Sequence, residues 1–206
     1  MLRNFTDILS IDLRSNLIDD IESGSFVANT KLEKIDLMGN RLVKITKHIF
    51  SSHFRELQEI NLSFNAIIDI ESGAFEKLVN LKSIDLSGNC IRHLHSDLFK
   101  KCEELREVNL HNNDIIKVPY NLFNVKAHLK VLDLSHNHLN FIPDLEANSI
   151  GYYDMSFNNI THFDLNYENE GRRRKLARIE TLTVAFNRIS LCLELREMRD
   201  DIVHLD

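Results

Sequence analysis

Apolar and polar residues alternate along this chain in an eleven-residue pattern that occurs eight times. In residues 81–91, apolar side chains stand at the first, fourth, sixth and eleventh positions, and Asn89 stands at the ninth. Alternation at the fourth to sixth positions predicts a short β-strand with one buried face. The eight units begin at Ile8, Leu32, Leu57, Leu81, Leu105, Leu129, Ile150 and Ile179.

The ninth position of every unit is asparagine, and its spacing is nearly constant. Successive asparagines are 24, 25, 24, 24, 24, 21 and 29 residues apart. A fixed period of this length is typical of a solenoid of stacked repeats. Because an amide side chain can satisfy backbone groups that no strand ladder reaches, we expect these residues to hydrogen-bond from coil to coil. They are Asn16, Asn40, Asn65, Asn89, Asn113, Asn137, Asn158 and Asn187.

Two further features of the units predict how the coils pack. The fourth positions form an apolar column that is buried only when each unit stacks on the next. Ten residues after the first five asparagines stands phenylalanine, which predicts an aromatic row on the opposite side of the coil: Phe26, Phe50, Phe75, Phe99 and Phe123. The short segments around these phenylalanines contain helix formers and predict one helical or 3₁₀ turn each.

These residues, over essentially the whole chain, resemble the leucine-rich repeat family, in the 24-residue subclass common in animal extracellular proteins. The resemblance implies an α/β horseshoe, with a parallel β-sheet on the concave face and short helical turns and loops on the convex face. Residues 1–206 then form one solenoid with eight complete repeats. The pieces at 1–7 and 202–206 read as parts of further repeats, as expected for a segment of a longer protein. The pattern is similar to that of insect immune proteins and Toll-type receptor ectodomains.

Composition excludes some classes of function. The formal net charge is −6, which argues against nucleic-acid binding, and the apolar runs are too short to span a membrane. No sequence motif of a catalytic or cofactor site is present, so we predict a protein without cofactor that is not an enzyme. Residues 1–7 do not form a signal peptide, which taken alone indicates a cytoplasmic protein, whereas the resemblance indicates an extracellular one.

The three cysteines predict no disulfide. Cys102 and Cys192 occupy apolar core positions, and Cys90 follows Asn89 and is expected near the surface. An odd number of cysteines without cap spacing leaves the redox compartment open.

The last repeats are irregular and supply the candidate binding residues. Exposed aromatic residues on a concave surface are frequent anchors of protein interfaces. Phe157 and Phe186 directly precede a repeat asparagine, so an alternative role is to cover the edge of the strands. The predicted binding residues are Val131, Tyr152, Phe157, Ala185, Phe186, His111 and His136.

Three further patterns in the sequence are weaker. A metal-dependent enzyme is a remote alternative, and its ligands would be His111, Asp133 and His136. These residues match no sequence signature of a metal site, so we predict no metal. The carboxylates at the fifth positions belong to the ordinary repeat pattern. The basic run at 172–175 lies in a predicted polar loop and suits an acidic partner, a protease or simple solvation.

Possible glycosylation sites occur at Asn4, Asn61 and Asn159, about as often as chance allows. A glycan on Asn61 would block the concave face.

We therefore predict a binding module that recognises a protein, or a glycan, on its concave face. By resemblance, this is ligand recognition in innate immunity by a secreted or cell-surface protein. The alternatives are a fragment of an adhesion or guidance receptor and a cytosolic scaffold. The fold alone names neither the ligand nor the oligomeric state.

Overall fold

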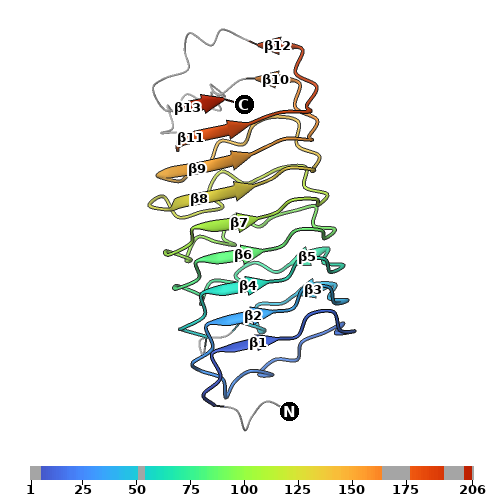
Figure 1. Ribbon diagram of the computed structural model, residues 1–206, viewed down its shortest axis with the longest axis vertical. Helices are drawn as coiled ribbons and strands as arrows, with labels where there is room; N and C mark the ends of the chain where they lie inside the picture. The colour runs from blue at the N-terminus through green and yellow to red at the C-terminus, as the bar shows by residue number, and fades with distance from the viewer. Residues whose placement is uncertain (1–5, 51–53, 164–176, 193–201, 206) are drawn as a thin grey trace.

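The computed structural model describes residues 6–50, 54–163, 177–192 and 202–205. Its main element is one sheet of parallel strands, stacked in chain order from β1 to β13 as in the ladder of Figure 1. In the described part of the chain nine strands belong to it. They are β1 (Ser10–Asp12), β2 (Lys34–Asp36), β4 (Glu59–Asn61), β6 (Ser83–Asp85), β7 (Glu107–Asn109), β8 (His128–Asp133), β9 (Ser149–Asp154), β11 (Arg178–Thr183) and β13 (Ile202–Leu205).

The strands pair in the register of the apolar column. Ile11 pairs with Ile35, Ile60 with Ile84, and the alignment continues to Leu182 and Leu205. Parallel neighbours require a crossover between them, and here each crossover is the loop of one coil. The predicted fold, a repeat solenoid with one parallel sheet, is confirmed.

Two small parallel ladders accompany the sheet on the flank of the solenoid. β3 (Lys44–Ile45) pairs with β5 (Asp69–Ile70), and β10 (His162–Phe163) pairs with β12 (Leu191–Cys192). Figure 1 shows both pairs on the same side of the main sheet.

The segments opposite the sheet consist of hydrogen-bonded turns. In the first coil, Ser25 N–H donates to the Glu22 carbonyl and Val27 N–H to the Gly24 carbonyl, at 3.1 Å each. Across residues 6–50, 54–163, 177–192 and 202–205 there is no helix, so the expected helical or 3₁₀ turns take this form. These segments are shorter than the length at which a helix becomes stable, and glycines with positive φ, such as Gly24, interrupt them. Within the same residues there is accordingly no helix that could span a membrane.

The predicted aromatic row forms the core behind the sheet. The rings of Phe75, Phe99 and Phe123 stack with centroid distances of 5.7 Å. In the 25-residue repeat the buried Phe54 joins the row, edge-on to Phe26 and Phe50. Cys102 is also buried, Cys90 is exposed, and the side chain of Cys192 lies outside the described residues.

The repeat asparagines connect each coil to the preceding one. Asn89 Nδ2 donates to the carbonyls of Leu62 and Leu86, at 3.0 and 2.9 Å, and its Oδ1 accepts the N–H of Ile67 at 3.0 Å. The same contacts recur at each ladder residue from Asn40 to Asn187. Asn16, in the first coil, is exposed and donates to carbonyls of its own coil.

Candidate functional site

Val131 and Tyr152 form the first part of the candidate site. They are register partners on β8 and β9, at the third positions of their repeats, where side chains point away from the core. Their exposed fractions are 36% and 39%. The Tyr152 hydroxyl donates to Asp154 Oδ2 at 3.2 Å, a contact that the sequence pattern did not reveal.

The second part is a stack of rings at the residues that precede the repeat asparagines. The ring of His136 lies 4.1 Å from that of Phe157, and Phe157 lies 4.3 Å from Phe186, with interplanar angles of 15° and 12°. Phe157 and Phe186 remain 42% and 73% exposed. Ala185 is half-buried beside them, and its carbonyl accepts the N–H of Phe157.

A left-handed backbone at this position produces the stack. Residues other than glycine rarely adopt the left-handed conformation, because positive φ brings Cβ close to the backbone. Repetition of the same turn places each residue above its counterpart in the next coil. All eight residues that precede a repeat asparagine have φ between 52° and 67°: Ser15, Gly39, Phe64, Gly88, Asn112, His136, Phe157 and Phe186.

His111, Asp133 and His136 lie close together without converging on a common point. His111 Nδ1 is 2.8 Å from Ser135 Oγ, which in turn donates to Asp133 Oδ1 at 2.6 Å. The His136 ring packs edge-on to His111 and is stacked on Phe157. Among the residues that the structure describes, no group of three acidic, histidine or cysteine side chains has the arrangement of a metal site.

The fifth-position carboxylates and amides shape the ends of the strands. Asp85 Oδ1 accepts the N–H of Ser87 at 2.8 Å, and Asp133 and Asp154 accept the N–H groups of Ser135 and Ser156 in the same way. Such short-range bonds stabilise the turn that follows an aspartate or asparagine. This is the physical basis of the repeated carboxylate pattern.

At the N-terminal end of the sheet, two adjacent carboxylates share one cation. Asp12 and Asp36 are register partners, and Arg14 lies between them. Arg14 Nη2 is 2.7 Å from Asp12 Oδ2, and its Nε is 3.5 Å from Asp36 Oδ2. Hydrogen bonds from the Arg14 guanidinium and backbone N–H lower the pKa of Asp12 to about 2.

The remaining predicted positions are dispersed. Asn61 is half-buried on β4, and its Oδ1 accepts hydrogen bonds from Ser63 N–H and Oγ. Asn159 is half-buried in the loop before β10. Asn4 and the basic run at 172–175 lie outside the described residues.

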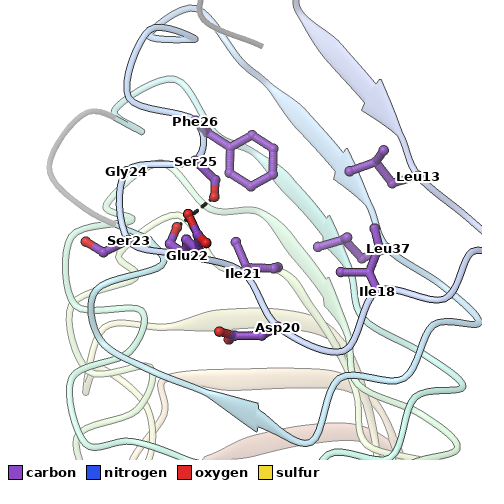
Figure 2. A pocket seen from close by; sticks show the side chains of 10 residues that line it. All are labelled: Leu13, Ile18, Asp20, Ile21, Glu22, Ser23, Gly24, Ser25, Phe26 and Leu37. Carbon is purple, nitrogen blue, oxygen red and sulfur yellow. Dashed lines mark hydrogen bonds between the residues drawn. The ribbon is translucent and has the colours of Figure 1, made fainter. Parts of the chain in front are cut away.

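A hollow of about 300 Å³ opens at the first coil (Figure 2). Leu13, Ile18, Ile21 and Phe26 point into it, and Leu37 of the second coil lies beside them. Equivalent apolar side chains in later coils are covered by both neighbours. The hollow is thus the end of the apolar core, where only one neighbouring coil is present among the described residues.

Comparison with known proteins agrees with the repeat geometry. Leucine-rich repeat families match residues 55–115 and 128–148. No curated protein matches the sequence.

Among solved structures, the chain is similar to one from the Toll–Spatzle complex, described as a molecular hub in Drosophila development and innate immunity. The TM-score is 0.71 and the identity 24%, over 90% of this chain and 26% of that one. It is also similar to the leucine-rich repeat domain of APL1B, with a TM-score of 0.70 and 19% identity, over 99% of this chain and 55% of that one. The chain therefore spans about a quarter and about half of these two structures. With its strand register and asparagine contacts, the chain has a leucine-rich repeat fold, similar to the Toll and APL1B domains, and leucine-rich repeat families match two segments of it.

Proposed function

We propose that this protein recognises a protein ligand in innate immunity, as part of a secreted or cell-surface protein. The ligand contacts the exposed face of strands β8, β9 and β11. The proposal is carried by one observation: Val131, Tyr152, Phe157 and Phe186 are all exposed on neighbouring coils at this end of the sheet. Leucine-rich repeat domains are generally modules for protein–protein interaction, and similarity to the Toll structure supports the immune assignment.

The physical argument rests on the type and location of these side chains. Tyrosine and phenylalanine offer large, rigid contact surfaces and are frequent at the centres of protein interfaces. A stack whose members fix one another loses little conformational freedom on binding, which lowers the entropic cost of association. The exposed rings are therefore suited to contact a partner without rearrangement.

Site-specific photocrosslinking tests this proposal. A photoreactive phenylalanine analogue replaces Tyr152, and the variant is mixed with the secreted proteins of the source organism and irradiated. A matched variant carries the analogue at Ile68, which is more accessible than Tyr152, at 58% against 39% exposure, and lies next to β5 on the flank. We expect a crosslinked protein from position 152 that is absent from position 68.

Affinity for the recovered protein gives the second measurement. Tyr152→Ala and Phe186→Ala should each weaken binding about tenfold or more, as expected for aromatic anchors, while Ile68→Ala leaves binding unchanged. Circular dichroism establishes that the variants are folded. Identical crosslinks from both positions, or unchanged affinity in both aromatic variants, would refute the proposal.

A further inference from the structure

Two rows of apolar and aromatic side chains border a strip of the exposed face near the C-terminal end of the sheet. Val131 and Tyr152 lie on one side of the strip, two residues before the fifth positions. On the other side is the ring stack that includes Phe157, three residues after Asp154, the fifth position of its repeat. The strip between them consists of the fifth and seventh positions of the repeats.

The strip contains an uncompensated pair of carboxylates. Asp133 and Asp154 are register partners on β8 and β9, about 5 Å apart at the backbone. Like charges directly opposite one another on neighbouring strands repel. Asp154 Oδ2 accepts the Tyr152 hydroxyl, and among the described residues neither carboxylate forms an ion pair with a lysine or arginine.

The N-terminal end of the same sheet shows how such a pair is neutralised. Asp12 and Asp36 have the same register relationship, and the guanidinium of Arg14 lies within 2.7 and 3.5 Å of their Oδ2 atoms. Arg14 stands two residues after Asp12. The corresponding residues after Asp133 and Asp154 are Ser135 and Ser156, which are too short and carry no charge.

We propose that the partner protein places an arginine side chain in this strip, between the two rows, where its guanidinium binds Asp133 and Asp154. The inference rests on the proposed function and deepens it by naming the chemistry of the ligand. The geometric basis is the aromatic border, together with serine in place of arginine at the positions that correspond to Arg14.

Arginine fits this surface better than lysine. Its planar guanidinium has donors along the edge, which suit carboxylates, and an apolar face that packs on aromatic rings. It is also more weakly hydrated than an ammonium group, so its transfer to a partly apolar strip costs less. The ring of Tyr152, held by its hydroxyl on Asp154, offers the adjacent aromatic surface.

Nuclear magnetic resonance of the isotope-labelled chain tests the inference without the partner. The probe is N-acetyl-argininamide, and the readouts are the carboxyl carbons of Asp133 and Asp154 and the ring of Tyr152. The control probe is the citrulline analogue, which has nearly the same shape and no charge. We expect saturable shifts with the arginine probe, centred on these three residues, and affinity at least about tenfold lower for the citrulline probe.

Two variants complete the test. Asp133→Asn/Asp154→Asn should abolish the shifts at Tyr152, whereas Asp85→Asn, in the same column between Asn61 and Asn109, should leave the affinity unchanged. Arg14→Ser should create a second responsive pair at Asp12 and Asp36, because it removes the resident cation.

The outcomes separate this inference from the proposed function. A response at Asp12 and Asp36 of Arg14→Ser with none at Asp133 and Asp154 would overturn the arginine assignment. So would equal binding of both probes, or shifts caused by CaCl₂ alone and not by the arginine probe. Loss of the crosslink from position 152 would instead refute the proposed function, since the probe titration does not depend on a protein partner.

The chain's own basic run at 172–175 is a competing occupant, and one further variant decides between the two. In Arg172→Ser/Arg173→Ser/Arg174→Ser/Lys175→Ser, unchanged affinity for the arginine probe supports an external partner. An affinity more than about tenfold higher would show that the run occupies the strip and would overturn the inference.

Discussion

An alanine at position 88 would place its Cβ 2.8 Å from Cδ1 of Phe64, closer than carbon atoms pack. Gly88 directly follows Phe64 in the column of left-handed residues before the repeat asparagines, and its own φ is +63°. The absence of a side chain at position 88 thus makes room for the exposed ring of Phe64.

Gly88→Ala should lower the free energy of unfolding by about 1–3 kcal/mol, because it adds left-handed strain and displaces the Phe64 ring. Gly24→Ala is the matched control: its φ is +80°, and no heavy atom of the described residues lies within 4 Å of the added Cβ. Urea unfolding of both variants separates strain from steric conflict. In Phe64→Ala/Gly88→Ala the conflict is removed, so the loss should be smaller than the sum of the single losses. Simple additivity would contradict this account.

The buried asparagines should stabilise the solenoid far more than the exposed one does. Asn113 Nδ2 donates to the carbonyls of Leu86 and Leu110, and its Oδ1 accepts the N–H of Ile91. Asn113→Ala leaves the buried Ile91 N–H without this acceptor and removes one of the two asparagine donors to each carbonyl, which Asn89 and Asn137 continue to contact, so it should cost about 2–4 kcal/mol. Asn16→Ala, at the exposed end, should cost less than about 1 kcal/mol. Comparable losses in chemical denaturation would argue against the coil-to-coil bonds as the main contribution.

The sequence predicted the periodic parts of this molecule well, and the reason is physical. A column such as Ile35, Ile60 and Ile84 is buried by an identical neighbour, so one local pattern determines both the strand and its register. The same reasoning placed Cys102 in the core and Cys90 on the surface. The repeat pattern did not predict the form of the turns opposite the sheet, because local hydrogen bonds and positive-φ glycines determine the conformation there.

The details of the candidate site were less accessible to sequence analysis. The pairing of Tyr152 with Asp154, and the bridge made by Arg14, depend on side-chain reach across strands rather than on spacing. The ring stack depends on the left-handed backbone before each asparagine. The sequence did contain a signal of this left-handed backbone, because Gly39 and Gly88 stand at the same repeat position as Phe157 and Phe186.

Tyr153 is expected to be a suboptimal core residue. It occupies the apolar column between Leu132 and Leu182, and its buried hydroxyl has no hydrogen-bond partner among the described residues. Burial and the nearby charge of Asp144 raise the pKa of this phenol, so it remains neutral. A buried polar group without a partner is unfavourable, so Tyr153→Phe should raise the free energy of unfolding by about 1 kcal/mol.

Tyr152→Phe is the control for this change. It removes an exposed hydroxyl from the adjacent residue and should change the stability by less than about 0.5 kcal/mol. Thermal and urea unfolding of the two variants provide the comparison. A stability loss in Tyr153→Phe would mean that the hydroxyl forms a favourable contact.

Asp12 and Arg14 give the sheet a pH-dependent contact at its N-terminal end. Hydrogen bonds from Arg14 lower the pKa of Asp12 from its ordinary 3.8 to about 2 in the folded protein. A carboxyl whose pKa is lower in the folded state favours folding when it is ionised. The contribution of Asp12 is therefore complete above a pH of about 4 and disappears as the pH falls toward about 2.

Arg14→Gln should return the pKa of Asp12 toward 3.8, as measured by carbon-detected titration of its carboxyl group. Glu71, whose pKa is lowered by Lys44 on the flank, should titrate unchanged in the same variant. A pKa of Asp12 that stays near 2 without the guanidinium would assign the shift to the Arg14 backbone N–H alone, which also donates to this carboxylate.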